Sequence, residues 1–186
     1  AAPGRALSAW VVLVTALLLS PRPAGAQVLS QKGFAEVQAI GYPQTTAKDQ
    51  TQLVGEALLR YEAAVRPVSW LRLNGAIDAR GDTHGQTEWD GIGWSDRSTK
   101  RPGLAVRRLD AILARGPLTL QVGKQFVRWG KTDVLTPTDR FAPRDFMEVV
   151  ETDFLPIAAV RATYERSGRT LDLVWQPRFT PSRTPA

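Results

Sequence analysis

The sequence is conspicuous first for what it lacks. It contains no cysteine and only one histidine, His84, among 186 residues. Without cysteine the chain forms no disulfide and has no thiolate for catalysis, and a lone histidine cannot supply the usual zinc ligands or a Ser-His-Asp arrangement. The 24 basic and 18 acidic residues are interspersed and form no basic patch. We therefore predict no enzymatic activity, no cofactor, no metal site and no nucleic-acid partner.

The first 26 residues have the pattern of a secretory signal peptide. Arg5 gives a positive start, residues 9–19 read "AWVVLVTALLL", and the small residues "AGA" precede Gln27. Eleven apolar residues are too few for a spanning helix, which needs about 20. The sequence predicts export with cleavage of residues 1–26, which leaves residues 27–186 as the mature part. No later apolar run approaches spanning length.

The mature part is rich in strand-like alternation. Residues 51–65 fit either a helix or a strand, but the next segment alternates clearly and contains Asn74 and Gly75, which disfavour a helix. The connection "RPVS" between the two segments suits a tight hairpin. The same reasoning yields seven expected strands, at 33–42, 51–65, 69–80, 103–115, 117–126, 158–166 and 170–176.

The connections between these strands alternate between short and long. Such alternation is typical of an antiparallel up-and-down transmembrane β-barrel, whose strands are apolar outside and polar inside. Tyr61 and Tyr164 near short turns, with Phe126 and Trp175 near long loops, would form aromatic belts on the apolar face. A soluble periplasmic β-sandwich also alternates, but its core favours bulkier residues than the Ala and Gly common here. We predict about seven strands of a barrel wall.

Two cations do not fit the alternation. Arg107 and Lys124 fall on the apolar side of their strands. A cation costs about 2–4 kcal/mol in the middle of a membrane and little near its surface. Lys124 lies near the outer end of its strand, so it either extends to the membrane surface or follows a bulge that shifts the register.

The polar face carries charges of both signs, which argues against a filter for one ion. Its predicted interior-lining residues are Glu56, Arg60, Glu62, Arg72, Asp78, Arg108, Asp110, Arg161, Glu165 and Asp172. The long loop at 128–156 is expected to fold inward as a constriction or plug. Its residues of interest are Arg128, Trp129, Lys131, Asp133, Asp139, Arg140, Arg144 and Asp145. Solvated ion pairs are the expected role of its charges, with calcium binding as the alternative.

Three segments carry a family resemblance: "GKQFVRWGKTDVLTPTDRFAPRDF" (123–146), "FLPIAAVRATYE" (154–165) and "LVWQPRFTPSRTP" (173–185). They resemble a group of large bacterial outer-membrane β-barrel proteins that are porin-like and mostly catalogued as a domain of unknown function. The resemblance implies that the chain supplies the N-terminal strands of a larger barrel in the outer membrane of a Gram-negative bacterium. Seven strands agree with this, because closed bacterial barrels have even counts.

Two functions follow from this interpretation. The first is a porin-like channel that passes an unknown solute through a mixed-charge interior, with membrane lipid around it. The alternative is a barrel that acts as a partner or scaffold in envelope assembly, or in export of an apolar compound, with its interior plugged. Both leave open a homo-oligomer or envelope transport partners. An outer-membrane hydrolase would need a converging nucleophile and base, which the isolated His84 does not provide.

Overall fold

The computed structural model describes an all-β chain. The described residues are 28–42, 50–96, 98–129, 141–147 and 153–184. The predicted signal peptide at 1–26 lies outside these ranges. Among the described residues, no helix has the length and hydropathy to cross a membrane.

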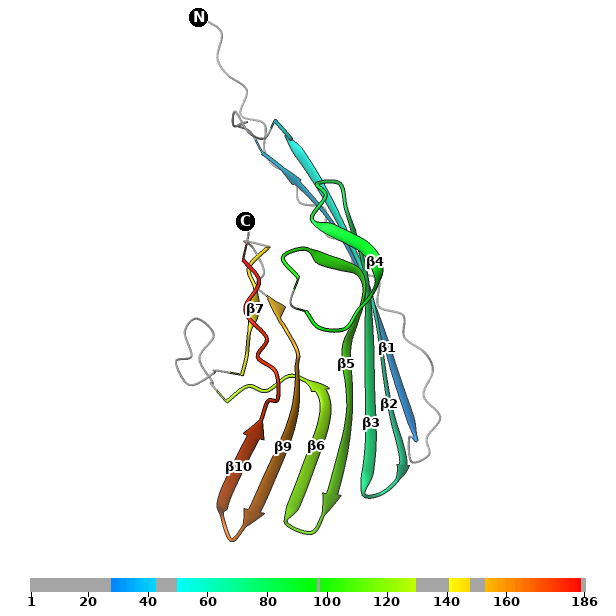
Figure 1. Ribbon diagram of the computed structural model, residues 1–186. Helices are drawn as coiled ribbons and strands as arrows, with labels where there is room; N and C mark the ends of the chain where they lie inside the picture. The colour runs from blue at the N-terminus through cyan, green and yellow to red at the C-terminus, as the bar shows by residue number, and fades with distance from the viewer. Residues whose placement is uncertain (1–27, 43–49, 97, 130–140, 148–152, 185–186) are drawn as a thin grey trace, which may run out of the picture.

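One antiparallel sheet dominates the fold, and its strands follow chain order from edge to edge (Figure 1). The strands are β1 (Leu29–Gly41), β2 (Leu53–Val68), β3 (Leu71–Asp82), β5 (Arg101–Arg115), β6 (Leu118–Gln125), β9 (Ile157–Arg166) and β10 (Arg169–Trp175). The seven expected strands and their up-and-down order are thus confirmed. Among the described residues, no strand pairs with the outer edge of β1 or of β10.

Three further strands were not expected from the sequence. β4 (Thr87–Gly93) pairs in parallel with β5, inside the long connection after β3. β7 (Arg144–Asp145) and β8 (Asp153–Phe154) pair only with each other. β7 and β8 have two residues each, too few to show alternation, which explains why sequence reasoning missed these two strands.

The tight turns lie together at the lower end of the sheet in Figure 1 and join β2 to β3, β5 to β6 and β9 to β10. In the last turn Ser167 and Gly168 have φ angles of 51° and 75°. Two successive positive φ angles define the hairpin turn whose twist matches that of its strands. The expected alternation of short and long connections is therefore present, and it places the long segments at the opposite end.

The large apolar side chains on one face of the sheet are exposed. Leu59 is 58% exposed and Leu73 is 44% exposed, although both lie within long strands. Other large apolar side chains of this face are also exposed, including Val37, Tyr61, Ile77, Leu109, Leu118, Tyr164, Leu171, Leu173 and Trp175. A small core lies on the opposite face, where Val127 packs with Ile157 and Ala159 of β9. Phe141 and Val174 pack against it. A soluble sandwich would have buried the strand leucines instead.

Two irregularities in the strands turn the side chains of Arg107 and Lys124 away from the apolar face. The register between β3 and β5 shifts between Ala76 and Ile77, which places Arg107 opposite no residue of β3. In β6, Gly123 has a φ of 125°, and a Cβ there would lie 2.3 Å from the carbonyl oxygen of Leu109. Only glycine tolerates this conformation, which interrupts the alternation.

The side chains that follow Gly123 are consequently inverted relative to the simple pattern. Lys124 is 2% exposed, forms an ion pair with Asp96 and donates a hydrogen bond of 2.6 Å to the carbonyl oxygen of Trp94. The Arg107 guanidinium lies 5.0 Å from the ring centre of Phe126. The prediction that Phe126 joins an aromatic belt on the apolar face is therefore wrong.

Candidate functional site

The polar face of the sheet is a continuous set of charged and amide side chains. Arg60 and Asp78 are opposite each other on β2 and β3 and form two hydrogen bonds of 2.7 and 3.0 Å. Arg161 of β9 bonds diagonally to Asp172 of β10, which is opposite Thr163, with a shortest contact of 2.5 Å. Because alternate residues of a strand share one face, these pairs define the polar side of the sheet.

The ten predicted lining residues share this face. A hollow on the face is lined in part by Arg60, Glu62, Arg72 and Arg108, which β2, β3 and β5 contribute. Asp110 is buried and accepts hydrogen bonds from Asn74 at 3.0 Å and from Gln121 at 2.9 Å. Asp78, Arg161 and Asp172 are paired as above, Glu56 lies near Arg101 at 3.4 Å, and Glu165 is exposed at the end of β9.

The centre of the site is a group of five charged residues, named here the Asp153 cluster. Arg60, Arg80 and Arg107 come from β2, β3 and β5, and they surround the carboxylates of Asp78 and Asp153. Arg107 donates two hydrogen bonds to Asp153, of 2.6 and 2.8 Å. Burial alone would raise the pKa of Asp153, but the hydrogen bonds from Arg107 and the three guanidinium charges hold it below its ordinary value.

A second charged group fixes the connecting segments to the sheet. Asp145 of β7 lies 3.1 Å from Arg101 of β5 and 2.6 Å from Arg183, and all three are at most 5% exposed. The backbone of Arg183 also bonds to Arg144 and Phe146. Burial favours a raised pKa for Asp145, but the charges of Arg101 and Arg183 lower it overall. The expectation of a solvated ion pair is wrong for Asp145, because this pair is buried.

The described part of the predicted constriction loop folds back onto the sheet and onto β8. Trp129 donates a hydrogen bond of 2.8 Å to Asp172, and the guanidinium groups of Arg128 and Arg144 lie 4.2 and 4.6 Å from the ring centre of Phe154. The four other predicted loop residues, Lys131, Asp133, Asp139 and Arg140, lie outside the described residues. No group of three or more acidic or histidine residues suited to a metal ion occurs in the described ranges.

Sequence reasoning missed five residues of the two charged groups: Arg80, Arg101, Arg107, Asp153 and Arg183. Arg80 has the same parity as Asp78 and could have been added from the pattern alone. Arg101 begins β5, outside the expected strand at 103–115. Asp153 and Arg183 lie beyond the regular strands, where alternation gives no information.

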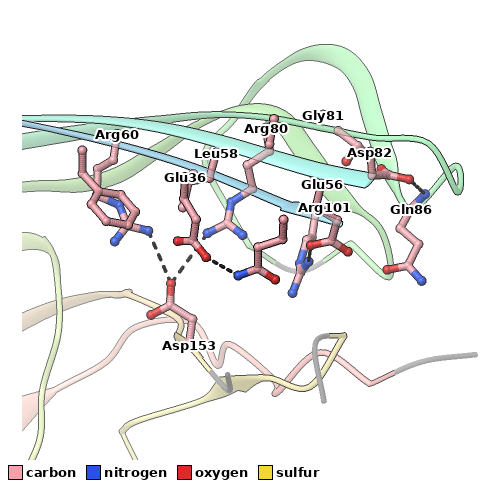
Figure 2. Close-up of a pocket in the computed structure, with 14 residues that line it drawn as sticks. Glu36, Glu56, Leu58, Arg60, Arg80, Gly81, Asp82, Gln86, Arg101 and Asp153 are labelled. Carbon is pink, nitrogen blue, oxygen red and sulfur yellow. Dashed lines mark hydrogen bonds and ion pairs between the residues drawn. The ribbon is translucent and has the colours of Figure 1, made fainter. Parts of the chain in front are cut away.

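A polar hollow of about 220 Å³ opens beside the Asp153 cluster. Its wall includes Glu36, Arg60, Arg80 and Asp153 together with the apolar Phe34 and Leu58. Figure 2 shows Glu36 and Asp153 pointing toward one another across this hollow, with Arg60 and Arg80 beside them. The arrangement can bind a charged group and accommodate a small apolar body next to it.

Comparison of the chain with protein-family models, with curated proteins and with solved structures found no match.

Proposed function

We propose that the chain forms part of the wall of an outer-membrane β-barrel, and that the barrel passes small hydrophilic solutes through a mixed-charge interior. The observation that carries this proposal is the division of one sheet into an exposed apolar face and a charged opposite face. Leu59, Leu73 and Leu173 are each more than two fifths exposed, while the ion pairs of the other face are largely buried.

The exposed apolar face needs a partner, because soluble proteins rarely leave a large contiguous apolar surface in water. Hydrocarbon chains would cover it without requiring a second protein layer, and strands that alternate apolar outside and polar inside match this environment. The resemblance of residues 123–146 to outer-membrane barrel proteins points the same way. Lipid is therefore the partner that we assign to this face.

The charged face would then line the barrel interior. Several of its arginines are paired with carboxylates, as in Arg60 with Asp78 and Arg161 with Asp172. Alternating charges of this kind hydrate a passage without excluding ions of either sign. The segments around Asp145 and Asp153 rest on this face and would narrow the passage.

The test is reconstitution of the full-length protein in planar lipid bilayers, combined with solute uptake by proteoliposomes. Folding is checked separately by heat-modifiable migration on gels, since folded barrels migrate differently from unfolded ones. A folded protein that conducts ions and admits small solutes supports the channel. A folded protein with neither conductance nor uptake contradicts it.

One observation favours a second function, in which the barrel is a partner or scaffold in envelope assembly or export. The ion pairs among Arg101, Asp145 and Arg183 bind two connecting segments tightly to the polar face, as a plug would be bound. Under this proposal the interior is filled and the folded protein does not conduct. Disruption of the group by Asp145→Asn would then open measurable conductance.

A further inference from the structure

The Asp153 cluster joins three strands to a carboxylate that does not belong to the sheet. Arg107 lies 2.6 Å from Asp153, and Arg60 and Arg80 lie 3.4 and 3.6 Å from the same carboxylate oxygen. We propose that these three arginines form a binding site for the carboxylate group of an organic solute, and that Asp153 occupies it as an internal ligand. This inference rests on the proposed channel and names the class of solute that it selects.

The two carboxylates of the cluster differ in their exposure to solvent. We assign a structural role to the buried one and a place in the binding site to the exposed one. The side chain of Asp78 is 4% exposed, and it holds Arg60 through hydrogen bonds of 2.7 and 3.0 Å. The side chain of Asp153 is 36% exposed and comes from the short strand β8. Asp78 therefore keeps the arginines in position, whereas Asp153 is accessible and can be exchanged for another carboxylate.

The charge of the cluster supports such an exchange. Three guanidinium groups face two carboxylates, so loss of the contact to Asp153 leaves an excess of two positive charges. An incoming carboxylate restores the original balance and meets the same donors. Paired arginine donors favour a planar carboxylate over a spherical anion such as chloride, because two parallel hydrogen bonds match its geometry.

The hollow beside the cluster indicates the size and polarity of the rest of the solute. Its volume of about 220 Å³ and the side chains of Phe34 and Leu58 leave room for a short apolar body beside Arg60 and Arg80. Glu36 faces Asp153 in the same hollow (Figure 2). Its negative charge would repel an anion bound there. The probe that follows from this lining is butyrate, and its neutral isostere butyramide tests whether the charge is needed.

The experiment is calorimetric titration of butyrate into the full-length protein folded in detergent, with folding confirmed by heat-modifiable migration. In Asp153→Asn the internal competitor is gone, so butyrate should bind roughly tenfold to a hundredfold more tightly than in the unmodified protein. Addition of Arg107→Gln should abolish that gain. Glu36→Gln should strengthen butyrate binding further, and butyramide should bind none of the variants.

The matched control is Asp172→Asn, which removes a carboxylate from the same face but away from the cluster, next to Arg161. An equal gain in Asp172→Asn and Asp153→Asn would overturn the proposal, because the effect would then be one of net charge. Equal affinity of the unmodified protein and Asp153→Asn would also overturn it. Calorimetry needs no conductance, so a protein that conducts without binding butyrate refutes this site alone, and one that binds without conducting refutes only the channel.

Discussion

A lysine at position 59 tests whether lipid covers the apolar face. Leu59 is six positions after Leu53 and nine before Val68, the two ends of β2. In the proposed barrel, with a rise of about 3.4 Å per residue and a tilt of about 45°, these ends would lie roughly 14 and 22 Å away along the membrane normal. Leu59 is thus about 4 Å from the middle of the strand. If lipid covers this face, a lysine there should destabilise the folded protein by about 2–4 kcal/mol, or roughly 30-fold to 900-fold in the folding equilibrium.

The assay is reversible guanidinium unfolding of the full-length protein in phosphatidylcholine vesicles, followed by tryptophan fluorescence. Two variants calibrate it. Ala64→Lys puts the same charge on the polar face of β2 and should change stability by less than about 0.5 kcal/mol. Leu118→Lys puts it next to the β5–β6 turn, near the membrane surface, and should cost about 0–1 kcal/mol.

The reasoning fails if Leu59→Lys also costs less than about 0.5 kcal/mol, which is the value expected for an exposed residue in water. It fails as well if the three lysines have equal effects, because depth and face would then be irrelevant. Either result would mean that water, and not hydrocarbon, surrounds the side chain that is 58% exposed here.

Three further predictions concern the irregular strand and the buried charges. Gly123→Ala should destabilise the protein by about 1–3 kcal/mol or more in denaturant titrations, because its Cβ would lie 2.3 Å from a carbonyl oxygen. The control is Gly75→Ala, whose Cβ would meet no atom within 4 Å and which should change stability little. Asp145→Asn should lower the free energy of unfolding by about 3–5 kcal/mol in the same titrations, since it leaves Arg183 buried beside a neutral group. A loss below about 1 kcal/mol would contradict a buried ion pair. The pKa values of Asp145 and Asp153 lie below the ordinary 3.8, so their stabilisation is present above that value and is lost as the pH falls through the lowered native values. Pepsin should therefore cleave the connecting segments readily only below about pH 4, and equal cleavage at pH 5 would refute this.

The sequence predicted most of the regular structure, because alternation reports directly on which face a side chain occupies. It could not place Arg107, Lys124 and Phe126, since a bulge or a positive φ reverses parity without altering the residue types around it. The Asp153 cluster likewise combines residues that alternation predicts with one that it does not. Arg60 and Asp78 followed from alternation, while Asp153 reaches the cluster by a long connection whose path depends on tertiary contacts.

The outer edges of β1 and β10, which pair with no strand among the described residues, have a consequence for how such a sheet could enter a bilayer. Each edge carries a row of backbone N–H and C=O groups that water can satisfy but hydrocarbon cannot, at several kcal/mol for every group left alone. If the proposed barrel is correct, its strands could therefore not enter the membrane one after another. The last pair of strand edges would have to join before or during entry, so that insertion would be a single concerted event and any factor that shields an open edge would control its rate.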